Sequence, residues 1–373
     1  MVSPAGDSFD VNGEPGSNQS TATPELLLGR SQVQFDLSEA MDYLRGKKIL
    51  ITGAGGSIGS KLCEAVLPGL PAQIIAVDRS EQGIYDLDER LGRKHGPTEI
   101  VLSMTDVAER PRMARLFDTH SPDVVFHAAA YKHVRYVEEN PEAGVINNVL
   151  GTRTVAELAL QAGCAKFVLI SSDKAVEPAS IMGATKRLCE MITLNLPSRG
   201  ETESIAVRFG NVVRSRGSVI PKFETQIAVG RPVTVHPQAK RYFMSMHEAV
   251  GLVLRSMIVG QRGDICIQKM GDAVRMLDIA KRLLAANNLP ATDASFCDTE
   301  LLPGEKLCEK LTTEKEHAAG IDMGHMLLCR LPASNLDFSM LDDLLELANK
   351  GERESLCRLL WQIVGDSRAT AIV

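Results

Sequence analysis

The sequence predicts an α/β fold, in which a doubly wound parallel sheet carries helices on both faces and a smaller C-terminal lobe follows. Short β-branched runs alternate with amphipathic stretches of helix length from Lys48 onward, and this alternation requires crossover connections between parallel strands. A glycine-rich turn joins the first run to the next helical stretch. Beyond Gly210 the pattern changes to short pieces punctuated by glycine and proline, which indicates insertions that form the lobe.

Six apolar runs predict the strands, and the helix-length segments between them predict the crossovers. They are "KILIT" at 48–52, "QIIAVD" at 73–78, "EIVLSM" at 99–104, "DVVFHAAA" at 123–130, "KFVLISS" at 166–172 and "SIAVRFGN" at 204–211. We expect 1–24, rich in Gly, Pro, Ser and Asn, to be a disordered tail. The other predicted parts are an N-terminal arm and helix (25–46), the sheet domain (47–209 with about 236–262), the smaller lobe (210–235 with about 263–340) and a C-terminal helical segment (341–364).

Composition excludes several classes of protein. At 373 residues the chain can hold a sizeable core, and its net charge of −6 argues against a nucleic-acid partner. The eight cysteines are scattered without a CxxC pair, which predicts no metal site and a reducing compartment. No apolar run approaches the roughly 20 residues of a membrane helix, and no secretory signal is visible. We therefore expect a cytoplasmic protein without a membrane span.

The first chemical motif is the glycine-rich turn in "ILITGAGGSIGS" at 49–60, which follows a predicted strand and opens a predicted helix. Glycines there allow a tight turn and a close approach of the backbone to a pyrophosphate, which then lies at the helix N-terminus. The motif therefore predicts a Rossmann-type site for NAD or NADP. Its candidate residues are Gly53, Gly55, Gly56, Ser57, Ile58 and Gly59.

Acidic residues at the ends of the next two runs extend this site. Asp78 lies 19 residues after Gly59, where a carboxylate binds the adenosine ribose. Arg79 and Ser80 follow and could instead hold the 2′-phosphate of NADP, or Arg79 could be a solvated surface charge. Asp106 in "SMTD" could accept a hydrogen bond from the adenine amino group, or act as a helix N-cap before "VAERPRM".

The fourth run, "FHAAAYKHV" at 126–134, also borders the predicted crevice. His127 is expected to be packed in the core. Lys132 and His133 follow the carboxyl end of the strand, where doubly wound sheets bind ligands, and a solvated loop is an equal alternative. Asn147 in "VINNVLGT" is expected to bond within its helix or to order the site. The small cofactor candidates, which let the backbone lie against a dinucleotide, are Ala128, Ala129 and Ala130.

The stretch "SSDKAVEPASIMGATK" at 171–186 combines two features. Asp173 and Lys174 stand at the carboxyl end of the fifth run, which places them at the same crevice. Met182 and Lys186 are four residues apart, so on a helix they share one face. Three ionisable groups are thus predicted to converge near the nicotinamide, and Lys186 is also a candidate cofactor contact.

Seven stretches in this order resemble the bacterial UDP-N-acetylglucosamine 4,6-dehydratases of polysaccharide and glycan biosynthesis, members of the extended short-chain dehydrogenase/reductase superfamily. They are "LLLGRSQVQFD", "TGAGGSIGS", "FHAAAYKHV", "SSDKAVEPASIMGATKR", "RFGNVVRSRGSVIPKF", "KRYFMS" and "LPGEKLCEKL". The resemblance runs from Leu26 to about Val364. In this superfamily a Tyr ordinarily stands where this chain has Met182, but Met is usual in the membrane-bound branch of the family.

Two departures from the family pattern bear on function. The transmembrane helices of the membrane-bound branch are absent from this sequence, which suggests a soluble form or a shortened chain. "PAS" at 178–180 stands where the family commonly has Pro-Thr-Asn. The substrate contacts at this point are therefore open.

The resemblance implies a complete reaction. Hydride passes from sugar C4 to NAD(P)⁺, the 4-ketone acidifies the C5 proton, water leaves from C6, and hydride returns to C6. Lys174 becomes the base at C5, kept neutral by burial and by positive charge from Lys186, and Asp173 the protonated acid for the C6 hydroxyl. Ser172, or a water held by Lys186, relays the C4 proton in place of Tyr. Met182 becomes an apolar wall beside the nicotinamide.

The resemblance also implies that the smaller lobe binds the UDP-sugar substrate. Asn211, Arg216 and Arg241 would contact the diphosphate and uridine, since a guanidinium matches phosphate oxygens with two parallel bonds, although each could equally be a surface charge. Glu305 could hold a ribose hydroxyl or cap a helix, and the backbone at 218–219 borders the uracil. The substrate candidates are Lys132, His133, Asn211, Arg216, Ser218, Val219, Arg241 and Glu305.

Two other functions stay open. A nucleotide-sugar epimerase uses the same C4 oxidation without elimination, and a non-catalytic sensor binds a dinucleotide without chemistry. The retained pair of Asp173 and Lys174 argues against the sensor. We also expect a homo-oligomer, most simply a dimer that pairs the helices starting near Gly151 and Gly183, which are those that pair between subunits in the superfamily.

Overall fold

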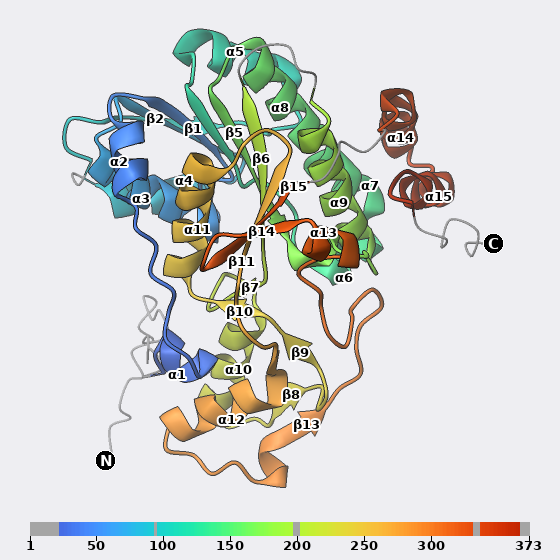
Figure 1. Cartoon of the computed structure of the whole chain (residues 1–373). Coiled ribbons are helices and arrows are strands. Elements are labelled where there is room, and N and C mark those ends of the chain that lie inside the picture. Colours follow the sequence, from blue (N-terminus) through green and yellow to red (C-terminus); the bar gives the residue numbers. More distant parts are fainter. Residues whose placement is uncertain (1–21, 93–94, 197–201, 331–335, 366–373) are drawn as a thin grey trace, which may run out of the picture.

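The computed structural model describes residues 22–92, 95–196, 202–330 and 336–365. The tail predicted to be disordered lies outside these ranges, except for residues 22–24. The described chain forms a large upper body and a smaller lower lobe in the view of Figure 1. None of the helices in these ranges is long and apolar enough to cross a membrane.

The upper body is built on one large sheet, which confirms the predicted doubly wound fold. Strands β1 to β6 and β11 pair in parallel. Strands β15 and β14 are added antiparallel at the edge next to β11. The direction of winding reverses between β1 and β4, so a crevice opens there at the carboxyl ends of the strands. The spatial order is β3 (Glu99–Met104), β2 (Gln73–Asp78), β1 (Lys48–Thr52), β4 (Val124–His127), β5 (Lys166–Ser172), β6 (Glu203–Phe209), β11 (Asp264–Gln268), β15 (Met326–Arg330) and β14 (Gly320–Asp322).

Helices cover both faces of the sheet (Figure 1), and each layer buries its own apolar core. The strands are apolar on both sides, as parallel strands between two helical layers must be. One layer holds α5 (Arg110–His120), α7 (Pro141–Gly144), the π-helical stretch η2 (Val145–Leu150), α8 (Gly151–Gln161) and α9 (Ile181–Leu194). The other holds α2 (Ser38–Leu44), α3 (Ser57–Val66), α4 (Glu81–Leu91) and α11 (Met246–Val259). Short elements are η1 (Leu67–Gly69), α6 (Val134–Glu139), η3 (Asp173–Ala175) and α13 (Glu314–Ala318).

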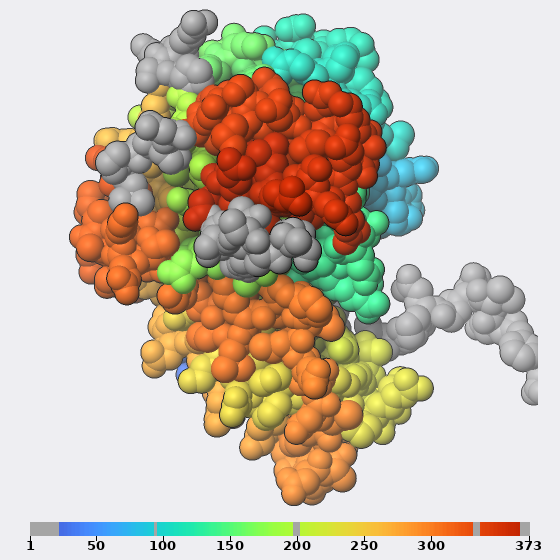
Figure 2. Space-filling model, turned by 90° about the vertical axis from the view of Figure 1, so that its right-hand side faces the viewer, coloured from blue at the N-terminus to red at the C-terminus, as the bar shows by residue number. Residues whose placement is uncertain are grey.

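A helical hairpin of α14 (Phe338–Lys350) and α15 (Arg353–Ile363) packs on α7, η2 and α9. Figure 2 shows it as a broad red plate over this face. Leu344, Leu360 and Trp361 are buried in the same core as α9, and twelve of the fourteen residues of α9 are buried. The homo-oligomer stays a prediction, and the face expected to pair with a second copy carries the hairpin of the same chain.

The lower lobe has a separate apolar core. It contains α1 (Pro24–Leu28), α10 (Val219–Ala228), α12 (Met276–Ala286), η4 (Asp293–Ser295), the pair β8 (Val233–Val235) and β13 (Phe296–Asp298), and the pair β9 (Lys240–Arg241) and β12 (Val274–Arg275). The pair β7 (Asn211–Val212) and β10 (Phe243–Met244) lies between lobe and body (Figure 1).

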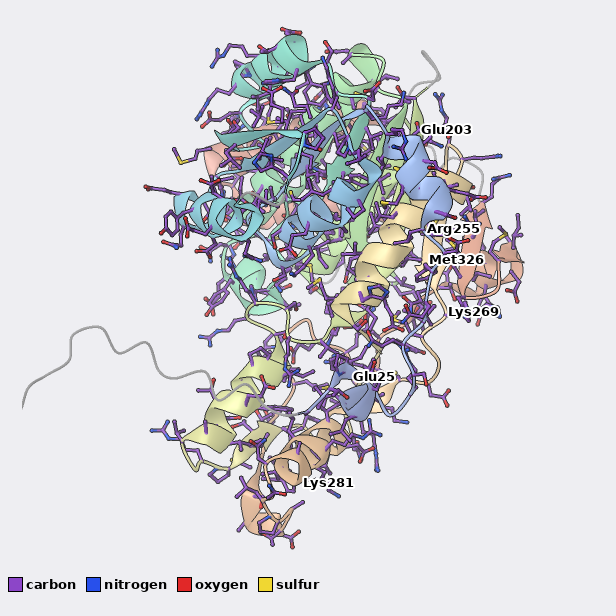
Figure 3. All side chains as sticks on the ribbon, turned by 90° about the vertical axis from the view of Figure 1, so that its left-hand side faces the viewer. Glu25, Glu203, Arg255, Lys269, Lys281 and Met326 are labelled. Atoms are coloured by element: carbon purple, nitrogen blue, oxygen red, sulfur yellow. The ribbon has the colours of Figure 1, made fainter. Side chains whose placement is uncertain are left out.

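The boundary between body and lobe differs from the prediction in two places. Residues 264–268 and 320–330, expected in the lobe, include three strands of the main sheet, because β11 is buried along its whole length against β6. The start of the N-terminal arm, α1, packs on α12 of the lobe. Figure 3 shows Glu25 of α1 close to the lobe, which carries Lys281, and below Arg255 and Met326 of the body.

His127 at the end of β4 is 1% exposed, which confirms the expected core position. Its Nδ1 lies 2.8 Å from the Thr52 hydroxyl and its Nε2 lies 3.0 Å from the Thr152 hydroxyl. Burial, together with the charge of Lys186, lowers the pKa of His127 to about 3. The folded chain therefore holds this ring neutral, while the unfolded chain protonates it below about pH 6.5.

This difference predicts a loss of stability in acid. Because the unfolded state binds the proton first, His127 should cost about 2 kcal/mol of unfolding free energy between pH 7 and pH 5. His127→Gln should remove that part of the pH dependence, measured by urea unfolding at both pH values. His325→Gln, at an exposed position, is the control. An unchanged pH dependence in His127→Gln would contradict the assignment.

Candidate functional site

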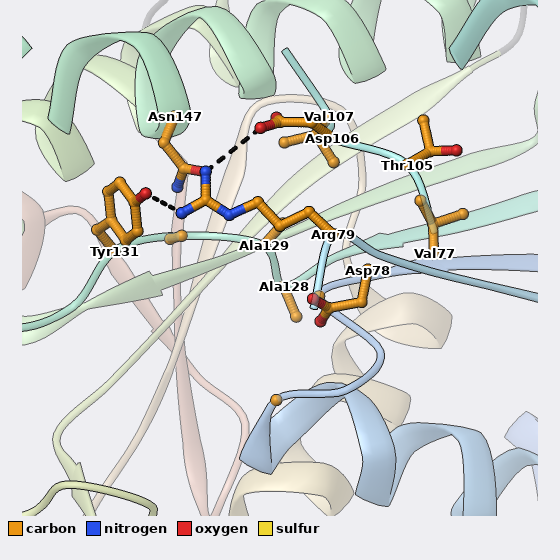
Figure 4. A pocket seen from close by; sticks show the side chains of 13 residues that line it. Val77, Asp78, Arg79, Thr105, Asp106, Val107, Ala128, Ala129, Tyr131 and Asn147 are labelled. Carbon is orange, nitrogen blue, oxygen red and sulfur yellow. Dashed lines mark hydrogen bonds and ion pairs between the residues drawn. The ribbon is translucent and has the colours of Figure 1, made fainter. Parts of the chain in front are cut away.

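A cavity lies at the carboxyl ends of β1, β2, β3 and β4, close to the point where the winding of the sheet reverses (Figure 4). It brings together the glycine-rich turn, the end of β2, the "SMTD" turn and the small residues after β4. These are four of the predicted cofactor stretches. The lining residues are Gly53, Gly56, Val77, Asp78, Arg79, Thr105, Asp106, Val107, Ala128, Ala129, Ala130, Tyr131 and Asn147.

The glycine-rich turn is packed too tightly for side chains. Gly53 has a φ of +65°, and a Cβ atom there would lie 2.7 Å from the nitrogen of Ala129. At Gly59 a Cβ atom would lie 2.1 Å from the Gly53 carbonyl oxygen. Helix α3 begins at Ser57, beside the cavity, so its positive end can receive a pyrophosphate. Ile58, predicted as a cofactor contact, packs against the core.

Asp78 fixes the end of β2 to the glycine-rich turn. Its Oδ2 accepts a hydrogen bond from the Gly55 nitrogen at 2.9 Å, and its Oδ1 accepts one from the Ser80 nitrogen at 2.9 Å. Ser80 is the N-cap of α4, where its hydroxyl accepts from the Gly83 nitrogen at 3.1 Å. Asp78 also lines the cavity, and its contact with a ribose stays a prediction.

Arg79 lies across the wall of the cavity (Figure 4). Its guanidinium is 4.5 Å from the centre of the Tyr131 ring, bonds the Tyr131 hydroxyl, and pairs with Asp106 at 3.3 Å. Asp106 also accepts from the Ala108 nitrogen at 2.9 Å. The alternative role of Asp106 as an N-cap is wrong, because α5 begins at Arg110 and Asp106 closes the preceding turn.

The predicted acid and base lie on a short turn, η3, directly after β5. Asp173 is 0% exposed, and its Oδ1 accepts from the Ser172 hydroxyl at 2.9 Å and from Lys174 Nζ at 3.0 Å. Its Oδ2 is buried and has no hydrogen-bond partner among the residues that the structure describes. Lys174 Nζ also donates to Asn211 Oδ1 at 3.3 Å. The structure therefore places Asn211 of β7, predicted as a substrate contact, beside the same turn.

Helix α9 approaches this turn very closely. A Cβ atom at Gly183 would lie 2.4 Å from the Lys174 carbonyl oxygen, so the contact requires glycine. Met182 is 2% exposed and belongs to the apolar core. Lys186 is also buried, and its Nζ donates to the Ile170 carbonyl at 2.6 Å. Burial lowers the pKa of Lys186, against the opposing charges of Cys189 and Glu190.

The loop at 215–217 closes over the glycine-rich turn. The Arg216 nitrogen donates to the Ser57 hydroxyl at 3.0 Å, and the guanidinium reaches the Gly55 carbonyl at 3.1 Å and Asp86 at 2.7 Å. Lys132 Nζ is 3.4 Å from the Ser215 hydroxyl. Arg216 is therefore placed at the predicted pyrophosphate end of the dinucleotide site.

His133 and Lys132 lie under this loop, and burial lowers the pKa of both side chains. A Cβ atom at Gly217 would lie 2.6 Å from the His133 ring. The loop therefore reaches the end of the "FHAAAYKHV" stretch only because residue 217 is glycine.

The remaining substrate candidates lie on the lobe. Arg241 is 9% exposed and donates to the carbonyls of Lys240 at 2.8 Å and Leu307 at 3.2 Å. Ser218 precedes α10, which begins at Val219, and its buried hydroxyl has no hydrogen-bond partner within the described ranges. The helix-cap alternative for Glu305 is wrong, because its carboxylate closes a turn by accepting from the Leu302 nitrogen at 3.2 Å.

Sequence reasoning missed Glu309, which is 4% exposed. Its Oε1 lies 3.9 Å from Lys174 Nζ, and its Oε2 lies 3.3 Å from Lys306 Nζ. Glu309 is the second acidic residue of "LPGEKLCEKL". No local pattern in this stretch indicates that it contacts the turn after β5.

A buried ion-pair network lies behind the turn and was also missed. Arg208 of β6 donates to Glu190 of α9 at 2.7 and 2.9 Å and to Glu316 of α13 at 2.9 and 3.1 Å. Burial alone would lower the pKa of Arg208, but the two carboxylates raise it. Ser171 joins the network through Glu190 at 2.6 Å, and Arg208 also holds the Leu311 carbonyl at 3.0 Å.

Comparison with known proteins identifies the family of the chain. A family model described as "Polysaccharide biosynthesis protein" matches residues 49–330. The chain is 44% identical to the probable polysaccharide biosynthesis protein EpsC of Bacillus subtilis over 300 residues, 80% of this chain and 50% of that protein. It is 34% identical to UDP-glucose 4-epimerase of Rickettsia canadensis over 305 residues, 79% of this chain and 85% of that protein.

Among solved structures, that of Pen from Bacillus thuringiensis matches with a TM-score of 0.72 and 31% identity, over 78% of this chain and 90% of that one. The chain spans about half the length of EpsC. The matched range nevertheless contains the whole cavity, the turn after β5 and the lobe segment that reaches it. The chain therefore belongs to the polysaccharide biosynthesis protein family and has the extended short-chain dehydrogenase/reductase fold.

Proposed function

We propose that this chain dehydrates a UDP-N-acetylhexosamine, most simply UDP-N-acetylglucosamine, to a UDP-4-keto-6-deoxy sugar for polysaccharide or glycan biosynthesis. The observation that carries the proposal is the turn after β5, where a buried carboxyl and an amine lie 3.0 Å apart. Elimination across C5 and C6 requires both an acid and a base. The glycine-rich turn and Asp78 would hold NAD(P)⁺, which would supply the remaining chemistry as the hydride acceptor for C4 and the hydride donor for C6.

The hydrogen bonds of the turn support a closed route for protons. Ser172 donates to Asp173 at 2.9 Å, so the proton released from the C4 hydroxyl can pass through Ser172 to Asp173. Asp173 then gives it to the C6 hydroxyl, which leaves as water. Lys174 removes the C5 proton and returns it when hydride enters C6. The balance is the loss of one water, without net reduction or oxidation.

The surroundings of the turn decide which residues help. Lys174 forms ion pairs with the carboxylates of Asp173 and Glu309. Lys186, whose positive charge was expected to act on Lys174, donates to the Ile170 carbonyl instead. Met182, buried in the core, contributes packing. A homo-oligomer and a cytoplasmic site of action belong to the same proposal.

The cofactor of choice in this proposal is NAD⁺. The Asp78 carboxylate is held at the end of β2 by two backbone N–H groups, and a negative group there binds ribose hydroxyls and repels a 2′-phosphate. Arg79, the candidate for holding that phosphate, is engaged by Tyr131 and Asp106.

An assay with UDP-N-acetylglucosamine and NAD⁺, followed by NMR, tests the reaction. We expect a 4-keto-6-deoxy product without accumulation of NADH, because hydride is returned in each turnover. A C4 epimer would favour the epimerase, for which the Rickettsia relative is the supporting observation. Cofactor binding without any product would favour the sensor.

Substitutions on the turn test the roles of its residues. Lys174→Ala and Asp173→Asn should lower kcat by about 10²- to 10⁴-fold, the usual contribution of general acid–base groups. Lys174→Ala should also abolish solvent deuterium incorporation at C5. Met182→Ala, which changes packing alone, should lose far less activity. Equal inactivity of Met182→Ala, with the variant folded and loaded with cofactor, would place the proton chemistry elsewhere.

Binding measurements test the cofactor preference. By calorimetry the chain should bind NAD⁺ at least about tenfold more tightly than NADP⁺, a difference of about 1.4 kcal/mol. Asp78→Asn should narrow this ratio because it removes the charge that repels the phosphate. Glu81→Gln, an exposed change in the neighbouring turn of α4, should leave the ratio as it is. Tighter binding of NADP⁺ to the unaltered chain would refute the preference.

A further inference from the structure

One segment of the chain, residues 302–311, packs along the turn that follows β5. Lys306 Nζ donates to the Val176 carbonyl at 2.7 Å, and Lys310 pairs with Glu177 at 2.8 Å. A Cβ atom at Gly304 would lie 2.8 Å from the Ser180 side chain. The segment is therefore built against residues 176–180, next to the predicted acid and base.

This packing buries a carboxylate that the proposed reaction has not used. Glu309 is 4% exposed, and its Oε2 forms no hydrogen bond in the described part of the chain. An ionised carboxylate is costly to bury unless a cation compensates it. The cations beside it are Lys174, 3.9 Å from Oε1, and Lys306, 3.3 Å from Oε2. Lys306 is already directed at the Val176 carbonyl.

The pairing of Lys174 with Asp173 raises a chemical difficulty. At 3.0 Å the two groups form an ion pair, in which the acid has lost its proton and the base has gained one. That is the state after elimination. Before elimination Asp173 carries a proton, so it no longer offers Lys174 a full negative charge as the amine takes the C5 proton. A second carboxylate must then stabilise the developing ammonium.

We propose that Glu309 is the positioning residue for Lys174: it holds the amine toward C5 and stabilises the charge that the amine acquires, while Asp173 serves the C6 hydroxyl. The inference rests on the proposed dehydration and adds a residue to it. An oriented, buried charge is effective here because little water screens it. Substrate binding by the lobe and proton transfer by the body thereby share one segment of chain.

The groups that can respond to pH around this contact come from several elements. Burial raises the pKa of Tyr242, and the charges of Cys308, Asp272 and Asp173 add to that effect. The charged and titratable groups placed near the contact are Asp173, Lys174, Tyr242, Lys306, Cys308 and Glu309. A substitution confined to Glu309 leaves the other five unchanged.

The test is Glu309→Gln, which keeps the shape of the side chain and removes its charge. We expect kcat for UDP-N-acetylglucosamine to fall on the order of 100-fold with little change in KM. The acidic limb of the pH–rate profile should move to lower pH, because an amine without a neighbouring carboxylate holds its proton less firmly. Glu309→Asp should restore part of kcat and return the limb toward its original pH.

The control is Glu314→Gln, the same chemical change at an exposed position at the start of α13, which should behave like the unaltered chain. Thermal unfolding of each variant shows whether it is folded. If the unaltered chain makes no 4-keto product, the proposed dehydration fails. If it does, and folded Glu309→Gln keeps its kcat and pH profile, the role of Glu309 is refuted. A loss of kcat in both variants without any shift of the acidic limb also refutes it.

Discussion

The arrangement of the chain behind the turn that follows β5 depends on one buried cation. Arg208 is 0% exposed, and a guanidinium removed from water is stable only when carboxylates compensate its charge. Those carboxylates come from α9 and α13, so satisfying Arg208 fixes two elements against β6 at once. Leaving Arg208 with one partner fewer costs about 3–5 kcal/mol by analogy with other buried pairs. The same guanidinium holds the Leu311 carbonyl, the end of the segment that delivers Glu309.

Glycines convert this framework into close contacts. The absence of a side chain at Gly59 lets the first turn of α3 touch the carbonyl of Gly53, and the absence at Gly183 lets α9 touch the backbone of Lys174. In any other residue, a Cβ atom would clash with the backbone at each of these contacts. The close approach of backbone segments thus determines the shape of the cavity and of the turn. It also determines where the polar side chains of both lie.

Local patterns were sufficient for six parallel strands of the sheet, β1 to β6, and for residues at the ends of these strands. Asp78 and Asp173 both follow apolar runs, and the parallel topology alone brings such residues to one edge. The sequence could not reveal Glu309 or Glu316, because their partners Lys174 and Arg208 are more than a hundred residues away in the chain. The strands at 264–268 and 320–330 were assigned to the lobe for a similar reason. Their pairing with β6 and with each other is a tertiary property.

Arg216 and Glu305 illustrate a different limit. The sequence around a charged loop residue does not indicate which side chain it contacts in the folded chain. Arg216 bonds Asp86 and the glycine-rich turn rather than being a solvated charge on the lobe. Tyr131 had no evident role until Arg79 was seen over its ring. Motifs therefore predicted which stretches line the cavity, whereas the partners of individual charges required the folded chain.

The hairpin of α14 and α15 has a consequence for how the site is supported. Leu344, Leu360 and Trp361 back the helix layer that carries Met182 and Lys186. The hairpin belongs to the same chain as the helices that it covers. Its effective concentration at this face therefore does not depend on the concentration of protein in solution. Dilution cannot remove it. Helix α9 therefore keeps this apolar backing within one chain, whatever the concentration of the protein.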